Sequence, residues 1–368
     1  MNDDTAEAAW ETLRATRWDP PGAASRSEER RKTYVFGLEQ AEQMFRAAAV
    51  VGPATRPLLI FYGLSQAGRA IAAAASRIET GDDWRLEGHG IKSTANSLRG
   101  LLPEIRVVAE PADTKGSFVR LSRLLDSQLW DRSFPVTLNT LWDVLPENRI
   151  SPLRDSGKTR RTPLQVEGPG LFEEPHPLAS LAVDHFPSWV IDSPQALKDF
   201  SGYLTSFPDA KGYHSFHREG AEPDAAPMFM LDNDGWATLF INWELPPRAA
   251  ASPSGSAAFV RDVTRRYNGF FYFFPSLGAA DHSLHPLMAW WAVLHTLSML
   301  ARYQPAEWGT HINVDASSHA VQLERILKEA ISILPTLIAE AIDQVANPRS
   351  YLASVDGFGP GGISPNAW

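Results

Sequence analysis

The sequence contains no cysteine among its 368 residues. This absence excludes disulfides, thiolate nucleophiles and every zinc or iron–sulfur site with cysteine ligands. A metal would need histidine, aspartate or glutamate instead. The Gly-x4-Gly-Lys-Ser/Thr motif that cradles phosphates is absent as well. We therefore expect no cofactor and no metal.

An excess of positive charge is also missing. The chain carries 34 Lys and Arg residues against 43 Asp and Glu, a net charge of −9. This balance opposes a purely electrostatic grip on nucleic acid or anionic lipid, although a local basic groove stays open. The fully apolar runs are too short to span a bilayer, and residues 1–18 have no apolar core of signal-peptide length. We expect a cytoplasmic protein without a membrane partner.

Helical periodicity dominates both ends of the chain. Apolar residues recur in steps of four and three after Ser27, and the segment after Pro57 is apolar on almost every side, which is typical of a buried helix. A Trp-rich segment ending at Tyr303 and a long apolar stripe follow near the other end. We predict helices over Ser27–Ala49, Pro57–Ile78, Asp281–Tyr303 (capped by Asp281 or Ser283) and Ala316–Val345, the last broken near Pro335.

The middle of the chain has a mixed pattern. Ile105–Ala109 and Met228–Leu245 show strand-like runs, and an Asp232–Gly235 turn divides the second run into a hairpin. We predict an α+β fold in which the terminal helices pack into one bundle around a central mixed region. Short helices are predicted over Phe118–Leu129 and Pro194–Leu204. The predicted parts are 1–113 (helical), 114–280 (central α+β lobe), 281–346 (helices packing on the first part) and 347–368 (Gly/Pro-rich tail).

A serine motif suggests one catalytic hypothesis. Gly63-Leu-Ser65-Gln-Ala67 after an apolar run is similar to the nucleophile elbow of serine hydrolases. That motif needs the serine on a tight strand-to-helix turn, whereas the residues before Ser65 have a helical pattern. Ser65 is thus a candidate nucleophile, with a helix-packing serine as the alternative.

Histidines form three candidate groups. His214 and His217 with Glu219, and His282 with His285, have a spacing that can chelate a metal on one helical turn, but neither pair has the His-Glu-x-x-His form. His89 lies between two glycines, which exposes its imidazole to a ligand. A structural turn histidine is the competing interpretation.

The end of the Trp-rich helix combines a cation, two aromatic rings and a carboxylate. Arg302 can favour the helix C-terminus and pair with Glu307, while Tyr303 and Trp308 staple the turn to the core. Alternatively, an arginine flanked by rings can hold a base or a phosphate.

Three blocks of the sequence resemble the YaaC-like family of bacterial proteins: RPLLIFYGLSQAGRAI within Ala41–Ala75, His-Gly-Ile at His89–Ile91, and HPLMAWWAVLHTLSMLARYQPAEW after Leu284. Their order and spacing agree with the family over most of the chain, and 114–276 matches least. The resemblance implies a soluble bacterial protein, transfers no catalytic role, and weakens the hydrolase hypothesis because the family has a packed helix at the Ser65 segment.

We expect a binding or interaction component with a protein partner or a second copy of the chain, in stress response or phage defence. The candidate binding surface consists of Tyr62, Arg69, His89, Arg302, Glu307 and Trp308. The alternatives are a serine hydrolase through Ser65 and a ribonuclease through Arg302. HEPN-type ribonucleases place a histidine four to six residues after an arginine, whereas His311 follows Arg302 by nine, and this spacing does not fit.

Overall fold

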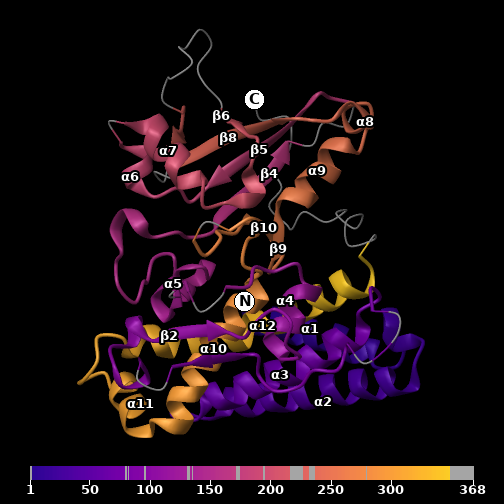
Figure 1. The fold of residues 1–368 in the computed structure, drawn as a ribbon, viewed down its shortest axis with the longest axis vertical. Coiled ribbons are helices and arrows are strands. Elements are labelled where there is room, and N and C mark those ends of the chain that lie inside the picture. Colours follow the sequence, from indigo (N-terminus) through magenta and orange to yellow (C-terminus); the bar gives the residue numbers. More distant parts are fainter. Residues whose placement is uncertain are drawn as a thin grey trace. The chain divides into compact units, whose positions relative to one another are not determined.

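The computed structural model describes residues 2–78, 81, 83–94, 97–130, 133–134, 136–170, 175–193, 195–215, 227–231, 237–278 and 280–348. The described chain divides into two compact units: one contains the residues up to Arg160 together with residues 284–348, and the other contains Arg161–Ser283 (Figure 1). Helices and antiparallel sheets occur together, so the predicted α+β class is confirmed. The finer division into four parts stays a prediction.

The first unit is framed by helices from both ends of the sequence. Helix α3 (Arg56–Ala74) packs along α2 (Glu28–Val50), and α12 (Ala320–Ala346) contacts both α3 and α1 (Asn2–Thr16). Figure 1 shows α2 and α3 side by side at one edge of this unit. The predicted packing of the terminal helices is confirmed. Helix α1 was not predicted from the sequence.

Two predictions about the C-terminal helices are wrong. Helix α10 (Pro286–Tyr303) begins later than expected, because His285 is its N-cap and its Nδ1 accepts a hydrogen bond from the Leu287 backbone N–H at 3.2 Å. Helix α12 continues through Pro335 without a break. Proline removes one backbone hydrogen bond, but buried residues on both sides of it, Leu334 and Leu337 among them, hold the helix in place.

The rest of the first unit consists of short elements around α10. Strands β1 (Ile91–Ser93), β2 (Arg106–Ala109) and β3 (Val136–Thr137) form an antiparallel sheet in sequence order. The predicted strand at residues 105–109 is therefore confirmed. The other elements are the helices α4 (Ser117–Leu124), α5 (Leu138–Asp143) and α11 (Pro305–Ile312), and the 3-10 turns η1 (Gly22–Ser25), η2 (Ser97–Arg99), η3 (Leu102–Glu104), η4 (Pro146–Asn148) and η5 (Gly157–Thr159).

The second unit is built on an antiparallel sheet with the strand order β6-β8-β5-β4-β10-β9, and β7 also pairs with β8. Alternate residues of β8 are buried, which places one face of the sheet on an aromatic core. The predicted pairing within 228–245 is confirmed by Met230 opposite Thr238, while its turn at 232–235 lies outside the described residues. The strands are β4 (Leu164–Gly170), β5 (Leu178–Asp184), β6 (His214–Ser215), β7 (Met230–Leu231), β8 (Ala237–Glu244), β9 (Arg265–Tyr267) and β10 (Phe270–Phe273); the helices are α6 (Ser188–Ile191), α7 (Ala196–Leu204), η6 (Pro208–Ala210), α8 (Pro247–Ala250) and α9 (Gly255–Val263).

Within the described residues, every helix is too short or too polar to pass through a bilayer.

Candidate functional site

The site begins with a narrow polar stripe on the otherwise apolar helix α3. Pro57 stands in the first turn of this helix, where its missing N–H costs nothing, and most of the residues that follow are buried. Tyr62 and Gln66 are partly exposed and Arg69 is exposed. Their spacing of four and three residues places these polar side chains on one line along the helix. This stripe is the only part of the middle of α3 that meets solvent among the described residues, apart from the partly exposed Ser65.

Arg302, in the last turn of α10, lies against this stripe. Its Nη1 donates a hydrogen bond to the Tyr62 hydroxyl at 2.5 Å, and its guanidinium carbon lies 5.1 Å from the centre of the Tyr303 ring. Within the described chain, no carboxylate lies within 4 Å of this guanidinium, and its Nε and Nη2 have no hydrogen-bond partner. The Nε–Nη2 edge is the fork that binds a carboxylate or phosphate through two parallel hydrogen bonds. The side chain therefore presents an uncompensated positive charge in a fixed position.

His89 reaches the same region from a turn that two glycines make. Gly88 and Gly90 have φ of +62° and +71°, in the left-handed region that glycine adopts without strain. The carbonyl oxygens of Gly88 and His89 accept hydrogen bonds from the Ser117 and Phe118 backbone N–H groups, at 3.4 and 2.9 Å. The turn thus satisfies the free N–H groups at the start of α4, and this contact fixes the position of His89.

The His89 imidazole packs against an aromatic group in the core. Its ring centre lies 5.7 Å from that of Phe61 and 5.6 Å from that of His295. Loss of solvent around the ring lowers the pKa of His89, the charge of Arg302 lowers it further, and Glu110 opposes both effects. His89 is therefore neutral at pH 7 and can donate one hydrogen bond and accept another.

His295 was missed by the sequence analysis. It lies in the middle of α10, is 1% exposed, and makes an edge-on contact with Phe61 at 5.3 Å between ring centres. Burial lowers its pKa to about 3, with His89 as the second cause, and its Nδ1 has no partner within the described chain. A histidine inside a helix of apolar and tryptophan residues was the signal that could have found it, because a buried polar atom without a partner is rare.

Arg302 is hydrogen-bonded to Tyr62 and its charge acts on His89, while Arg69 lies about two helical turns from Tyr62 on the same stripe. In the described chain, neither Trp308 nor Glu307 is bonded to any of these residues. Trp308 is 2% exposed, and its indole N–H lies 3.2 Å from both the Pro53 and the Ala54 carbonyl oxygens. This tryptophan therefore fixes α11 to the segment that precedes α3.

Glu307 acts on His311, and no ion pair joins it to Arg302 within the described chain. The carboxylate opposes the lowering of the His311 pKa, which is caused first by burial and then by His319. His311, the histidine nine residues after Arg302, therefore interacts with Glu307 and His319. This agrees with its spacing from Arg302, which does not fit a HEPN-type site.

Ser65 occupies the middle of the continuous helix α3. The strand-to-helix turn that exposes a hydrolase nucleophile is not formed there. The packed-helix alternative, which the family resemblance also implied, describes the local structure of this residue.

The two histidine pairs whose spacing could chelate a metal do not gather a ligand set in the described residues. His285 caps α10 through Nδ1, and its Nε2 lies 3.2 Å from the Gln344 side-chain oxygen. His217 and Glu219 lie outside the described residues, as does the side chain of His214. Across the part of the chain that is described, no three His, Asp or Glu side chains converge as a metal site requires.

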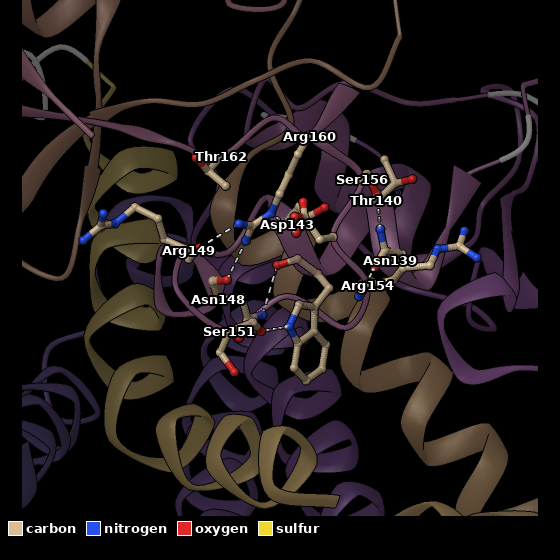
Figure 2. A network of polar contacts seen from close by, with 12 residues as sticks. Asn139, Thr140, Asp143, Asn148, Arg149, Ser151, Arg154, Ser156, Arg160 and Thr162 are labelled. Atoms are coloured by element: carbon tan, nitrogen blue, oxygen red, sulfur yellow. Dashed lines mark hydrogen bonds and ion pairs between the residues drawn. The ribbon is translucent and has the colours of Figure 1, made fainter. Parts of the chain in front are cut away.

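A second polar cluster, drawn in Figure 2, holds the loop after α5. Arg160 donates hydrogen bonds to the Asp143 carboxylate at 2.7 Å and to the carbonyl oxygens of Arg149 and Asn148, at 2.8 and 2.7 Å. Burial raises the pKa of Asp143 to about 6, although Arg160 opposes the shift. All these donors are directed at groups of the chain itself. The cluster therefore closes a loop and leaves no open position for a ligand at the Arg160 guanidinium.

These features define a helix-framed α+β protein with an exposed, uncompensated arginine beside a neutral histidine. The family described as YaaC-like Protein matches residues 3–342, so the chain belongs to the YaaC-like family. No curated protein and no solved structure matches the chain.

Proposed function

We propose that the chain is a binding component whose site, formed by Tyr62, His89 and Arg302, takes an anionic group of its partner. The observation that carries the proposal is the Arg302 guanidinium, which Tyr62 holds in place and which has no carboxylate partner within the described chain. Fixing a long side chain costs conformational entropy, and the Tyr62 bond meets that cost before a ligand arrives. Trp308 is left out of this surface because its ring is buried.

Inorganic phosphate is the simplest probe of this site. Thermal unfolding is measured in sodium phosphate and in sodium chloride of equal ionic strength. A ligand that binds the folded state raises the midpoint, so phosphate should raise it for the wild type and not for Arg302→Gln. Tyr62→Phe, which removes the hydroxyl and keeps the ring, should weaken the effect.

The matched control is Arg99→Gln, because Arg99 is exposed in the same unit but belongs to η2, not to the α3 stripe or α10. Its phosphate response should equal that of the wild type. An equal response from Arg302→Gln would refute the proposed site.

A second candidate function is a ribonuclease that uses Arg302 with His89 instead of His311. It is favoured by the neutral imidazole next to the guanidinium, because a neutral histidine can accept the proton of an attacking hydroxyl. An RNA-cleavage assay with the wild type and His89→Gln separates this function from binding alone. A fluorophosphonate probe tests the remaining hydrolase alternative at Ser65.

Stress response or phage defence stays the predicted context. Phage challenge of a host strain expressing the wild type or Arg302→Gln tests it. Protection by the wild type that the variant loses would support both the context and the site.

A further inference from the structure

A second positive charge, that of Arg69, lies farther along the polar stripe of α3. Arg69 donates from Nη1 to the Gln66 side-chain oxygen at 3.3 Å, which directs it back along the helix toward Tyr62. Seven residues separate Tyr62 from Arg69, a rise of about 10 Å along the helix. No carboxylate lies within 4 Å of the Arg69 guanidinium in the described chain. Two uncompensated cations therefore follow one line.

An exposed aromatic ring stands next to this line. Tyr303 is 58% exposed, and the Arg302 guanidinium lies over its ring. Large aromatic side chains are usually exposed only in part, whereas this one is mostly in solvent at the end of a buried helix. The negative charge of Glu110 acts on His89, whose pKa it raises.

We infer that this surface, Tyr62, Gln66, Arg69, Arg302 and Tyr303, binds single-stranded nucleic acid. The inference rests on the proposed function and names the class of its anionic partner. Cations spaced along a line follow a phosphate backbone, while an exposed ring accepts a base by stacking, whatever the base is. An acidic peptide would use the two arginines but leave the ring without a planar partner. The net charge of −9 opposes only non-specific electrostatic binding of nucleic acid by the whole protein surface.

Fluorescence anisotropy with labelled oligouridine and oligothymidine of about ten nucleotides tests the inference at several salt concentrations. Each phosphate contact on a single strand adds about −0.7 to the slope of log K against log salt. Two cations give a wild-type slope of about −1.4, and Arg302→Gln or Arg69→Gln should each reduce its size by about 0.7. Tyr303→Ala should keep the slope and weaken binding about tenfold, since stacking does not release counterions. Arg99→Gln should bind like the wild type.

Three outcomes overturn the inference. The first is that neither oligonucleotide binds. The second is that Tyr303→Ala and the arginine variants bind like the wild type. The third is that polyglutamate competes as well as the oligonucleotides do, which would indicate an acidic protein partner. If phosphate still stabilises the wild type through Arg302 while the oligonucleotides fail, the proposed function holds and only this inference falls.

Discussion

Replacing Arg30 should destabilise helix α3 more than the loss of any exposed arginine. Arg30 is 6% exposed and donates hydrogen bonds to the carbonyl oxygens of Ala72, Ala73 and Ala75 at the end of α3, at 3.3, 2.9 and 2.8 Å, and to that of Ile78 in the segment after it, at 2.6 Å. A helix end has carbonyl groups without intrahelical partners and a partial negative charge, so a buried cation there satisfies both.

The size of the effect follows from what Arg30→Ala leaves behind. The carbonyl oxygens of Ala73 and Ala75 accept buried bonds from Arg30 and would lose a charged donor. Each buried group left without a partner costs about 1–3 kcal/mol, so the loss of both bonds should cost about 2–6 kcal/mol in the free energy of unfolding, with the middle of that range near about 4 kcal/mol. Arg30→Lys keeps the charge but cannot span four carbonyl groups, and should recover less than half.

Hydrogen exchange followed by mass spectrometry measures this locally, which matters because a chain with two compact units need not unfold in one step. Exchange in the segment 56–74 should accelerate by about 100-fold or more in Arg30→Ala, since 1.4 kcal/mol corresponds to a factor of ten. Arg69→Ala, in the same helix, is the control and should change stability by less than about 0.5 kcal/mol. Equal exchange in the two variants would refute the capping role of Arg30.

Three further predictions concern titration and the glycine turn. The folded-state pKa of His295 is lowered from 6.5 to about 3, so the protein loses stability as pH falls between those two values, by about 4–5 kcal/mol at most. His295→Phe should therefore flatten this part of the curve of unfolding free energy against pH. Asp143 acts with the opposite sign, because its pKa is raised from 3.8 to about 6. Its contribution to stability is full below pH 3.8 and is lost as pH rises through 6, a change of about 2–3 kcal/mol. Asp143→Asn should abolish this change, measured by urea unfolding at pH 4 and pH 7. An unchanged pH dependence in either variant would contradict the assignment. Gly90→Ala would place a methyl group 2.8 Å from the Gly116 backbone at a φ of +71°, so we expect a loss of about 2 kcal/mol or more by thermal unfolding, whereas the corresponding change at Gly88, which has open space around it, should cost less.

Much of the helical frame could be predicted from the sequence because its cause is local. The apolar periodicity after Ser27 gives α2 to within one residue at each end, and that after Pro57 gives the start of α3 but extends four residues beyond its end at Ala74. The glycines on either side of His89 indicate a turn that presents an imidazole. Helix α1 was missed because its sequence is polar. It is held instead by contact with α12 and by ion pairs to α2, Glu7 with Arg46 at 3.0 Å and Arg14 with Glu42 at 2.5 Å.

The sequence by itself determined the long apolar helices α2, α3, α10 and α12, the exposed His-Gly turn and the candidate residues near it, because periodicity and glycine conformation are properties of neighbouring residues. Only the tertiary structure decided which of these residues meet. Arg302 bonds to Tyr62 across 240 positions, and Trp308 is turned into the core while Tyr303 stays in solvent. Such pairings depend on how α3 and α10 pack, and packing is set by the fit of many side chains at once, which no single segment encodes.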